Sequence, residues 1–197
     1  MASYNWDGDI ILRDIVINDK RYICTDYKKT IETDIRSWIS FEDNTIIKSF
    51  LKFIDLPCGS ELGAFDEKAL KIWQFVNKKI KYAHDSQQKR KNKDFWLFPE
   101  EVIALGHGDC EDYSFLVAAL LLASGISSYS VRVVLGEIFD NEGTSYGGHC
   151  WPMYKTEFGE WTILEYANGI NPNFLPHKFS NIHPFLKYTP YFCFNNH

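Results

Sequence analysis

One cysteine near the middle of the chain has the sequence context of a thiol nucleophile. Cys110 follows Asp109 and precedes Glu111, Asp112 and the apolar segment 115–123. Since Asp109 is a good N-cap residue and acids suit the first turn of a helix, Cys110 is predicted at the N-terminus of a buried helix. The helix field there favours the thiolate, whereas the adjacent acids oppose it, so a nearby imidazolium would have to offset them. The alternative is a buried structural cysteine, a common fate of this residue.

His149 is the candidate general base. It follows Gly147 and Gly148, which let backbone and ligand approach closely and leave the imidazole accessible at the start of a predicted strand. A histidine within hydrogen-bond reach of a cysteine can take the thiol proton and later give it to a leaving group. Taken alone, His149 would be interpreted as an ordinary surface histidine. Its assignment therefore depends on Cys110.

Glu165 is the candidate residue that orients His149. It lies among apolar residues of a predicted strand, so its carboxylate needs a polar partner. If 149–155 and 161–166 form a hairpin with a three-residue turn, Glu165 lies diagonal to His149 on the same face, whereas an even-numbered loop would place them on opposite faces. A bond between them would fix the histidine tautomer, as the third residue of a triad does. Asn168 is the nearest substitute.

An N-terminal β/α extension, residues 1–60, is predicted ahead of these candidates. Residues 10–24 alternate in character around an Asn18-Asp19 turn and predict a short hairpin. Apolar residues at steps of four, four and three predict an amphipathic helix over 27–39. A second helix is predicted over 44–54, stopped by a proline and a glycine that follow it.

The catalytic core is predicted over residues 61–197. A helix with one apolar stripe is expected from Asp66, its N-cap, to residue 80. Pro99 is suited to open a short helix, because the first helical position needs no N–H donor. After the helix that carries Cys110, three strands are predicted: 130–136, 149–155 and 161–166. Helices followed by an antiparallel sheet indicate an α+β domain, with an aromatic tail, 170–197, expected to wrap the surface.

Composition excludes several classes of protein. The chain of 197 residues suffices for one domain with a small appendage, and its net charge of −5 argues against nucleic-acid binding. The basic run 89–93 is interpreted as a solvated loop. Five cysteines without a CxxC pair favour reduced thiols over a disulfide framework or a zinc site. With no signal-like start and no apolar run of bilayer length, we expect a cytoplasmic protein without membrane contact.

Several motifs resemble the core of the transglutaminase-like superfamily, and most closely the bacterial transglutaminase-like cysteine peptidases. They are Asp94–Glu101, Gly108–Asp112, the apolar helix, Gly148–Trp151 and Trp161–Glu165. The resemblance covers about residues 65–168 and implies a papain-like core, in which a buried helix carrying the cysteine packs on an antiparallel β-sheet.

The same resemblance assigns roles to single residues. It implies that Cys110, His149 and Glu165 are nucleophile, base and orienting residue, although the family more often has Asp in the third place. Trp96 corresponds to the aromatic residue ahead of the active-site helix, and Tyr82 to a motif beside the cleft. Some relatives bind calcium through acids beside the cysteine, here Asp109, Glu111 and Asp112. We interpret these as helix caps and expect no cofactor.

The implied activity is thiol-dependent acyl transfer on amide bonds of a protein or peptide. The Cys110 backbone N–H and either Trp96 or Tyr82 are the candidate oxyanion donors. We expect water to resolve the thioester, because it is in large excess, which makes the protein a cysteine peptidase or amidase. A protein-glutamine transglutaminase, a deglycosylating amidase and a catalytically silent binding module remain open. The sequence predicts no oligomeric state.

Overall fold

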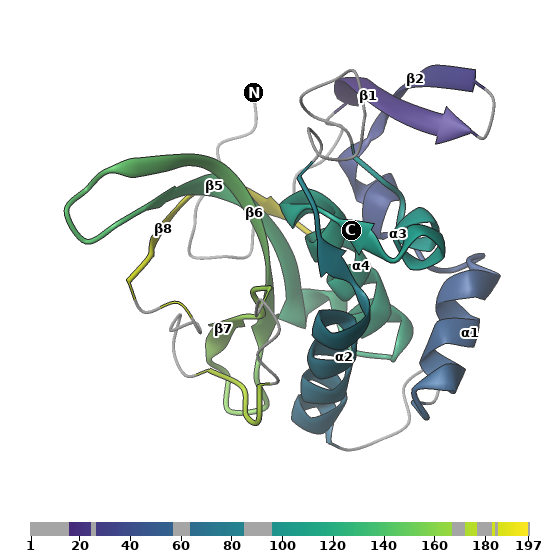
Figure 1. Cartoon of the computed structure of the whole chain (residues 1–197). Coiled ribbons are helices and arrows are strands. Elements are labelled where there is room, and N and C mark those ends of the chain that lie inside the picture. The colour runs from purple at the N-terminus through teal and green to yellow at the C-terminus, as the bar shows by residue number, and fades with distance from the viewer. Residues whose placement is uncertain are drawn as a thin grey trace.

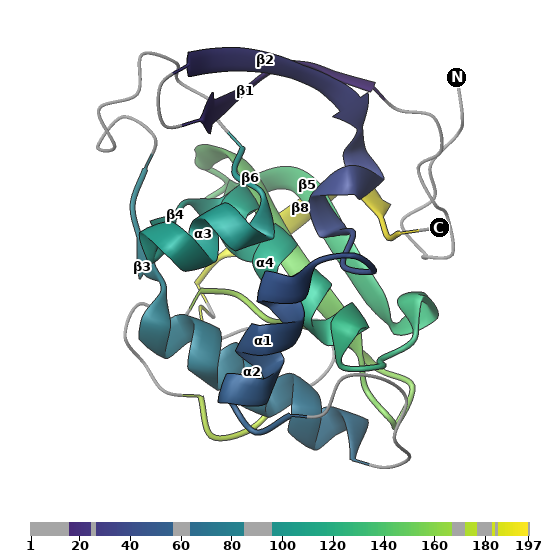
Figure 2. The same ribbon diagram turned by 90° about the vertical axis from the view of Figure 1, so that its right-hand side faces the viewer.

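A computed structural model describes residues 16–24, 27–56, 64–84, 96–166, 172–176, 183 and 185–196, with side chains from residue 35 onward. Helices gather on one side of a curved antiparallel sheet, and a separate hairpin lies at one end of the molecule (Figures 1 and 2). The predicted α+β class is confirmed. Among the described ranges, no helix has both the length and the apolar character needed to cross a membrane. The basic run 89–93, Asn168 and the residues predicted to stop the second helix, Pro57 and Gly59, lie outside the described residues.

The helix that begins at Cys110 lies at the centre of the core. This helix, α4 (Cys110–Ala123), is apolar on nearly every side and is buried from Asp112 to its end. It packs against β6 (Ser145–Lys155) of the sheet and against three further helices, namely α1 (Thr45–Phe53), α2 (Phe65–Lys79) and α3 (Pro99–Leu105). Gly125, at φ 89°, follows its C-terminus, as predicted. The helix α4 therefore lies between the sheet and the other helices (Figure 1).

The sheet has four antiparallel strands in the order β7-β6-β5-β8. They are β5 (Val131–Phe139), β6 (Ser145–Lys155), β7 (Trp161–Ile163) and β8 (Lys187–Phe194). A short 3-10 helix, η3 (Ser128–Ser130), precedes β5. In the β6–β7 hairpin Lys155 pairs with Trp161, and the Leu164 N–H donates to the Pro152 carbonyl at 3.0 Å. Of the two loop lengths considered from the sequence, this is the register that a three-residue turn gives. The strand is shorter than the predicted 161–166, so Glu165 follows β7 instead of lying in it.

The predicted helix over 27–39 is wrong. The chain forms β1 (Val16–Cys24) and β2 (Tyr27–Asp34), and only Ile35–Ile39 is helical, as the 3-10 helix η1. Thr30, Ile31 and Thr33 are β-branched and favour a strand when a partner strand is available. The Asn18-Asp19 turn is also wrong, because these residues lie inside β1 at a register shift, and the chain reverses after Cys24.

Asp66 is not the N-cap of α2. The helix begins one residue earlier, after Ala64 at φ 53°. Asp66 Oδ1 instead accepts hydrogen bonds from the Tyr154 hydroxyl at 2.8 Å and the Glu157 N–H at 3.0 Å. Since acids suit the first turn of a helix as well as the cap, the sequence did not distinguish the two positions. Asp66 thereby ties α2 to the β6–β7 hairpin.

The C-terminal residues extend the sheet instead of only wrapping the surface. β8 pairs with β5, and Pro190 is accommodated because β8 is an edge strand. The pairing requires a glycine at position 136, where an added Cβ would overlap the Thr189 carbonyl oxygen and lie 2.7 Å from the Trp151 ring. Two short parallel strands, β3 (Lys81–Tyr82) and β4 (His107–Gly108), hold the chain that enters α4.

Candidate active site

A capping box positions Cys110 in the first turn of α4. Asp109 is the N-cap, and Asp112 Oδ2 accepts the Asp109 N–H at 3.2 Å. Asp112 Oδ1 accepts the Leu97 N–H at 2.7 Å, so one buried carboxylate ties the helix start to the segment ahead of α3. Gly108 permits this approach, since a Cβ there would lie 2.9 Å from Asp112 Oδ2. The sequence prediction for the Cys110 helix is therefore matched in detail.

Burial and a neighbouring carboxylate favour the protonated form of the Cys110 thiol. The side chain is half-buried, and its sulfur donates to Glu111 Oε2 at 2.9 Å. Burial and the Glu111 charge raise the pKa of the Cys110 thiol well above its ordinary value, with further contributions from Cys150 and Asp109. The helix N-terminus was expected to favour the thiolate, but in this arrangement the acids and burial prevail. Deprotonation of Cys110 therefore requires a base.

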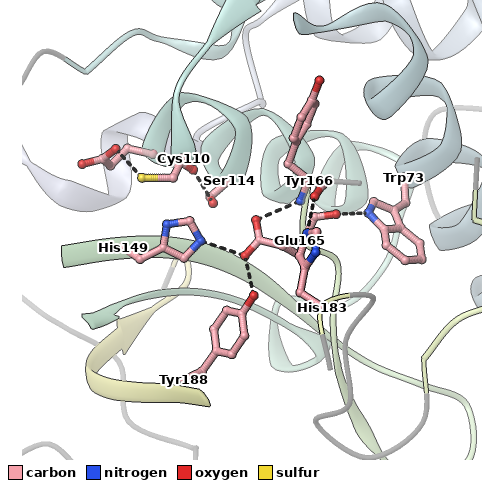
Figure 3. A network of polar contacts seen from close by, with 9 residues as sticks. Trp73, Cys110, Ser114, His149, Glu165, Tyr166, His183 and Tyr188 are labelled. Atoms are coloured by element: carbon pink, nitrogen blue, oxygen red, sulfur yellow. Dashed lines mark hydrogen bonds and ion pairs between the residues drawn. The ribbon is translucent and has the colours of Figure 1, made fainter. Parts of the chain in front are cut away.

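His149 and Glu165 form a pair with fixed geometry (Figure 3). His149 Nε2 lies 2.8 Å from Glu165 Oε2, which also accepts the Tyr188 hydroxyl at 3.1 Å. Glu165 Oε1 accepts the Tyr166 N–H at 2.9 Å, and the Glu165 backbone oxygen accepts Trp73 Nε1 at 2.8 Å. The carboxylate is therefore buried but fully hydrogen-bonded, which removes most of the cost of burying its charge.

The electrostatics of this pair favour a protonated imidazole. Burial alone lowers the pKa of His149, but the charge and hydrogen bond of Glu165 and the charge of Glu111 outweigh it and raise the pKa above its ordinary value. In Figure 3 the imidazole stands between the Cys110 sulfur and the Glu165 carboxylate, with Nε2 toward Glu165 and the other ring nitrogen on the Cys110 side. In its neutral form the imidazole can accept a proton from the Cys110 side, and Glu165 then stabilises the imidazolium that results.

The two predicted cleft residues lie in different places. Tyr82, at the end of β3, interacts with Cys110, and burial, followed by this interaction, raises the pKa of the Tyr82 hydroxyl. Trp96 lies in the aromatic core, with its ring 5.5 Å from that of Trp38 and 5.1 Å from that of Phe115. The oxyanion roles predicted for both residues stay predictions.

Three residues that surround Glu165 were not predicted from the sequence: Trp73, Tyr166 and Tyr188. Tyr188 lies on β8, and its ring also packs at 5.0 Å against that of Trp151. Residues 187–194 are rich in aromatic residues that favour strands, a signal that could have predicted β8 as an edge strand, the position that Pro190 requires. No local pattern shows that Tyr188 contacts Glu165, because that contact depends on the pairing of β8 with β5.

Comparison with known proteins relates the chain to a sequence family and to a solved structure. A sequence model described as the transglutaminase-like superfamily matches residues 57–166. The structure is similar to that of LapG from Legionella pneumophila, with a TM-score of 0.54 and 22% identity over 78% of this chain and 74% of that one. The calcium-bound form of LapG gives a TM-score of 0.52 and 22% identity over 77% and 73%. At this identity the likeness shows the fold alone.

A curated relative matches a shorter segment. The UPF0252 protein PH0672 of Pyrococcus horikoshii is 44% identical over 57 residues, which are 29% of this chain and 18% of that protein. The match therefore spans less than a fifth of the length of this relative.

Proposed function

Because the chain belongs to the transglutaminase-like superfamily, we propose that it is a thiol-dependent acyl-transfer enzyme that hydrolyses amide bonds in proteins or peptides. The observation that carries the proposal is the buried His149–Glu165 pair, whose imidazole stands beside Cys110 at the start of α4. Cys110 is the nucleophile, His149 the general base and acid, and Glu165 the residue that orients His149.

In the first half of the reaction the thiol leaves Glu111 and gives its proton to His149 Nδ1, because Nε2 is engaged by Glu165. The sulfur attacks the amide carbonyl carbon, and the carbonyl oxygen becomes an oxyanion. The Cys110 N–H has no partner within its helix, since it lies in the first turn, and is one donor to this oxygen. The Tyr82 hydroxyl is the second. When the C–N bond breaks, the proton on Nδ1 passes to the leaving amine.

The second half returns the thiol. His149 Nδ1 takes a proton from water, whose oxygen attacks the thioester carbon, and the C–S bond breaks to release the acid. The proton then passes from Nδ1 to the Cys110 sulfur. During both halves the Glu165 carboxylate stabilises the imidazolium, as its three hydrogen-bond donors hold it in place.

A search for products from a peptide mixture tests this proposal. The chain is incubated with a proteome-derived peptide mixture, and new N-termini are identified by mass spectrometry. We expect new N-termini with the wild-type chain and with Cys193→Ala, a matched control at a buried cysteine away from the site, and none with Cys110→Ala. A parallel sample contains a fluorescent primary amine. Incorporation of that amine without new N-termini would mean that the protein is a transamidating enzyme. If neither new N-termini nor amine incorporation is found, the protein is better explained as a binding module.

Calcium is a separate question, since LapG has a calcium-bound form. Asp112 gives both carboxylate oxygens to backbone N–H groups, and Glu111 accepts the Cys110 thiol. In the part of the chain that the structure describes, no group of three or more His, Cys, Asp or Glu side chains has the arrangement of a metal site. Calcium takes ~6–8 oxygen ligands, and to bind it here Asp112 and Glu111 would have to give up these hydrogen bonds. If the chain does not bind calcium, its melting temperature should be the same in calcium and in EGTA. A higher melting temperature in calcium would show that it does.

A further inference from the structure

A cavity of about 270 Å³ opens beside the His149–Glu165 pair. Ile138, His149 and Tyr188 project into it from one face of the sheet, since Ile138 pairs with both Gly147 and Tyr188 and neighbouring paired residues share a face. The full lining is Tyr82, Ile138, His149, Glu165, Tyr166, His183, Leu186 and Tyr188. The cavity thus shares a wall with the proposed catalytic pair.

The walls of this cavity are mainly aromatic and apolar. The rings of Tyr82 and Tyr166 lie 5.3 Å apart on one side. The polar groups are already engaged, because the Tyr188 hydroxyl donates to Glu165 and His183 Nε2 bonds to the Tyr166 carbonyl at 3.0 Å. The Glu165 charge is shared among three donors. A cationic side chain would find no free carboxylate here, whereas an apolar one would find contact on several sides.

The size of the cavity fits one side chain. Its volume of about 270 Å³ lies just below the ~300–1,000 Å³ of pockets that hold a whole drug-sized ligand. A substrate residue that buries one large apolar side chain in this cavity should therefore react roughly 10- to 150-fold faster than glycine at the same position.

The position of the cavity decides which part of a substrate enters it. His149 must reach the leaving amine to give it a proton, so the residue that supplies this amine lies over His149. His149, which stands beside Cys110, lines the cavity together with Tyr82, so the cavity begins next to the reacting atoms (Figure 3). We infer that this cavity is the subsite for a large apolar or aromatic residue on the leaving-amine side of the scissile bond. The inference rests on the proposed acyl transfer at Cys110.

Amine competition tests the subsite without knowledge of the natural substrate. The enzyme is acetylated with p-nitrophenyl acetate, and amino-acid amides are added as acceptors. The amine nitrogen attacks the thioester carbon, the C–S bond breaks, and the amine proton returns to the thiolate through His149. The readout is the acetyl-amino-acid amide formed relative to acetate, corrected for the reaction without enzyme. We expect phenylalanine amide to exceed glycine amide by roughly 10- to 150-fold, and lysine and glutamate amides to stay near glycine.

Variants that fill the cavity test whether it causes the preference for phenylalanine amide. Ile138→Trp should fill the cavity and reduce the phenylalanine-to-glycine ratio to near one, and Leu186→Trp is a second filling variant should the first not fold. Ile46→Trp, at an exposed position of α1 outside the cavity, should leave the ratio unchanged. Equal acceptance of all amides, a preference for lysine amide, or a ratio that survives both filling variants would overturn the subsite. Absence of any acetyl group on Cys110 would instead overturn the proposed function on which it rests.

Discussion

Glu111→Gln should make the Cys110 thiol more reactive. In the wild-type chain the thiol donates to Glu111 Oε2 at 2.9 Å, and the Glu111 charge is second only to burial among the causes that raise its pKa. Glutamine keeps the size of the side chain and an oxygen that can accept the thiol hydrogen, but removes the charge. The thiol pKa should therefore fall, and the curve of reaction rate against pH should shift to lower pH.

The size of the effect follows from two opposing terms. A like charge in direct contact changes a pKa by about one to three units. Below the pKa, each unit increases the thiolate fraction tenfold, but the thiolate also loses nucleophilicity with a Brønsted coefficient of about 0.4–0.5. The net gain in rate at neutral pH is therefore about 3- to 60-fold.

Thiol–disulfide exchange with dithiodipyridine measures this rate directly. The rate is followed over a pH series, and the reaction of the Cys110→Ala chain is subtracted to remove the other cysteines. Glu142→Gln, an exposed carboxylate in the β5–β6 turn, is the matched control and should react as the wild type does. A Glu111→Gln chain that reacts at the wild-type rate, or with a higher thiol pKa, would show that Glu111 does not hold the thiol protonated.

Three further substitutions test the elements around the site. In Glu165→Gln the pKa of His149 should fall toward 6.5, as seen by NMR titration, because the charge and hydrogen bond of Glu165 raise it. In the wild-type chain, protonation of His149 adds to the free energy of unfolding. This contribution is fully present below pH 6.5 and is lost as the pH rises through the higher pKa of the folded state. The free energy of unfolding of Glu165→Gln should therefore increase less than that of the wild type when the pH is lowered through the pKa of His149. Tyr188→Phe should lower the free energy of unfolding by about 1–3 kcal/mol in urea, since Glu165 Oε2 loses a donor; an unchanged value would mean that water replaces it. Gly136→Ala should lower the free energy of unfolding by about 1–3 kcal/mol, because the added Cβ meets the Thr189 carbonyl and displaces β8. An unchanged free energy of unfolding would contradict the tight β5–β8 contact.

Local sequence chemistry predicted the helix that presents Cys110, and it reduced the register of the β6–β7 hairpin to two alternatives, one of which is observed. Capping residues and acids in the first turn act within a few residues of each other, so their effect can be inferred without the fold. The β6–β7 register depends on a short turn, which is also local.

The features that the sequence predicted wrongly, or did not predict, depend on contacts between residues far apart in the chain or on side-chain orientation. Spacing alone suggested a helix over 27–39, but pairing with β1 decides the strand. The place of Tyr188 beside Glu165 depends on an edge strand far along the chain. The raised pKa of Cys110 depends on the orientation of the Glu111 side chain and on burial, neither of which a sequence specifies.

The most direct test of the proposed acyl transfer is the site and fate of an acetyl group supplied by p-nitrophenyl acetate. We predict that peptide mapping finds a thioester on Cys110 of the wild-type chain that neutral hydroxylamine removes. We predict that it forms much more slowly in His149→Ala, which keeps the nucleophile but lacks the base. An acetyl group found only on lysines or on another cysteine, or one that forms on Cys110 at the same rate in His149→Ala, would contradict the proposal that Cys110 and His149 act together.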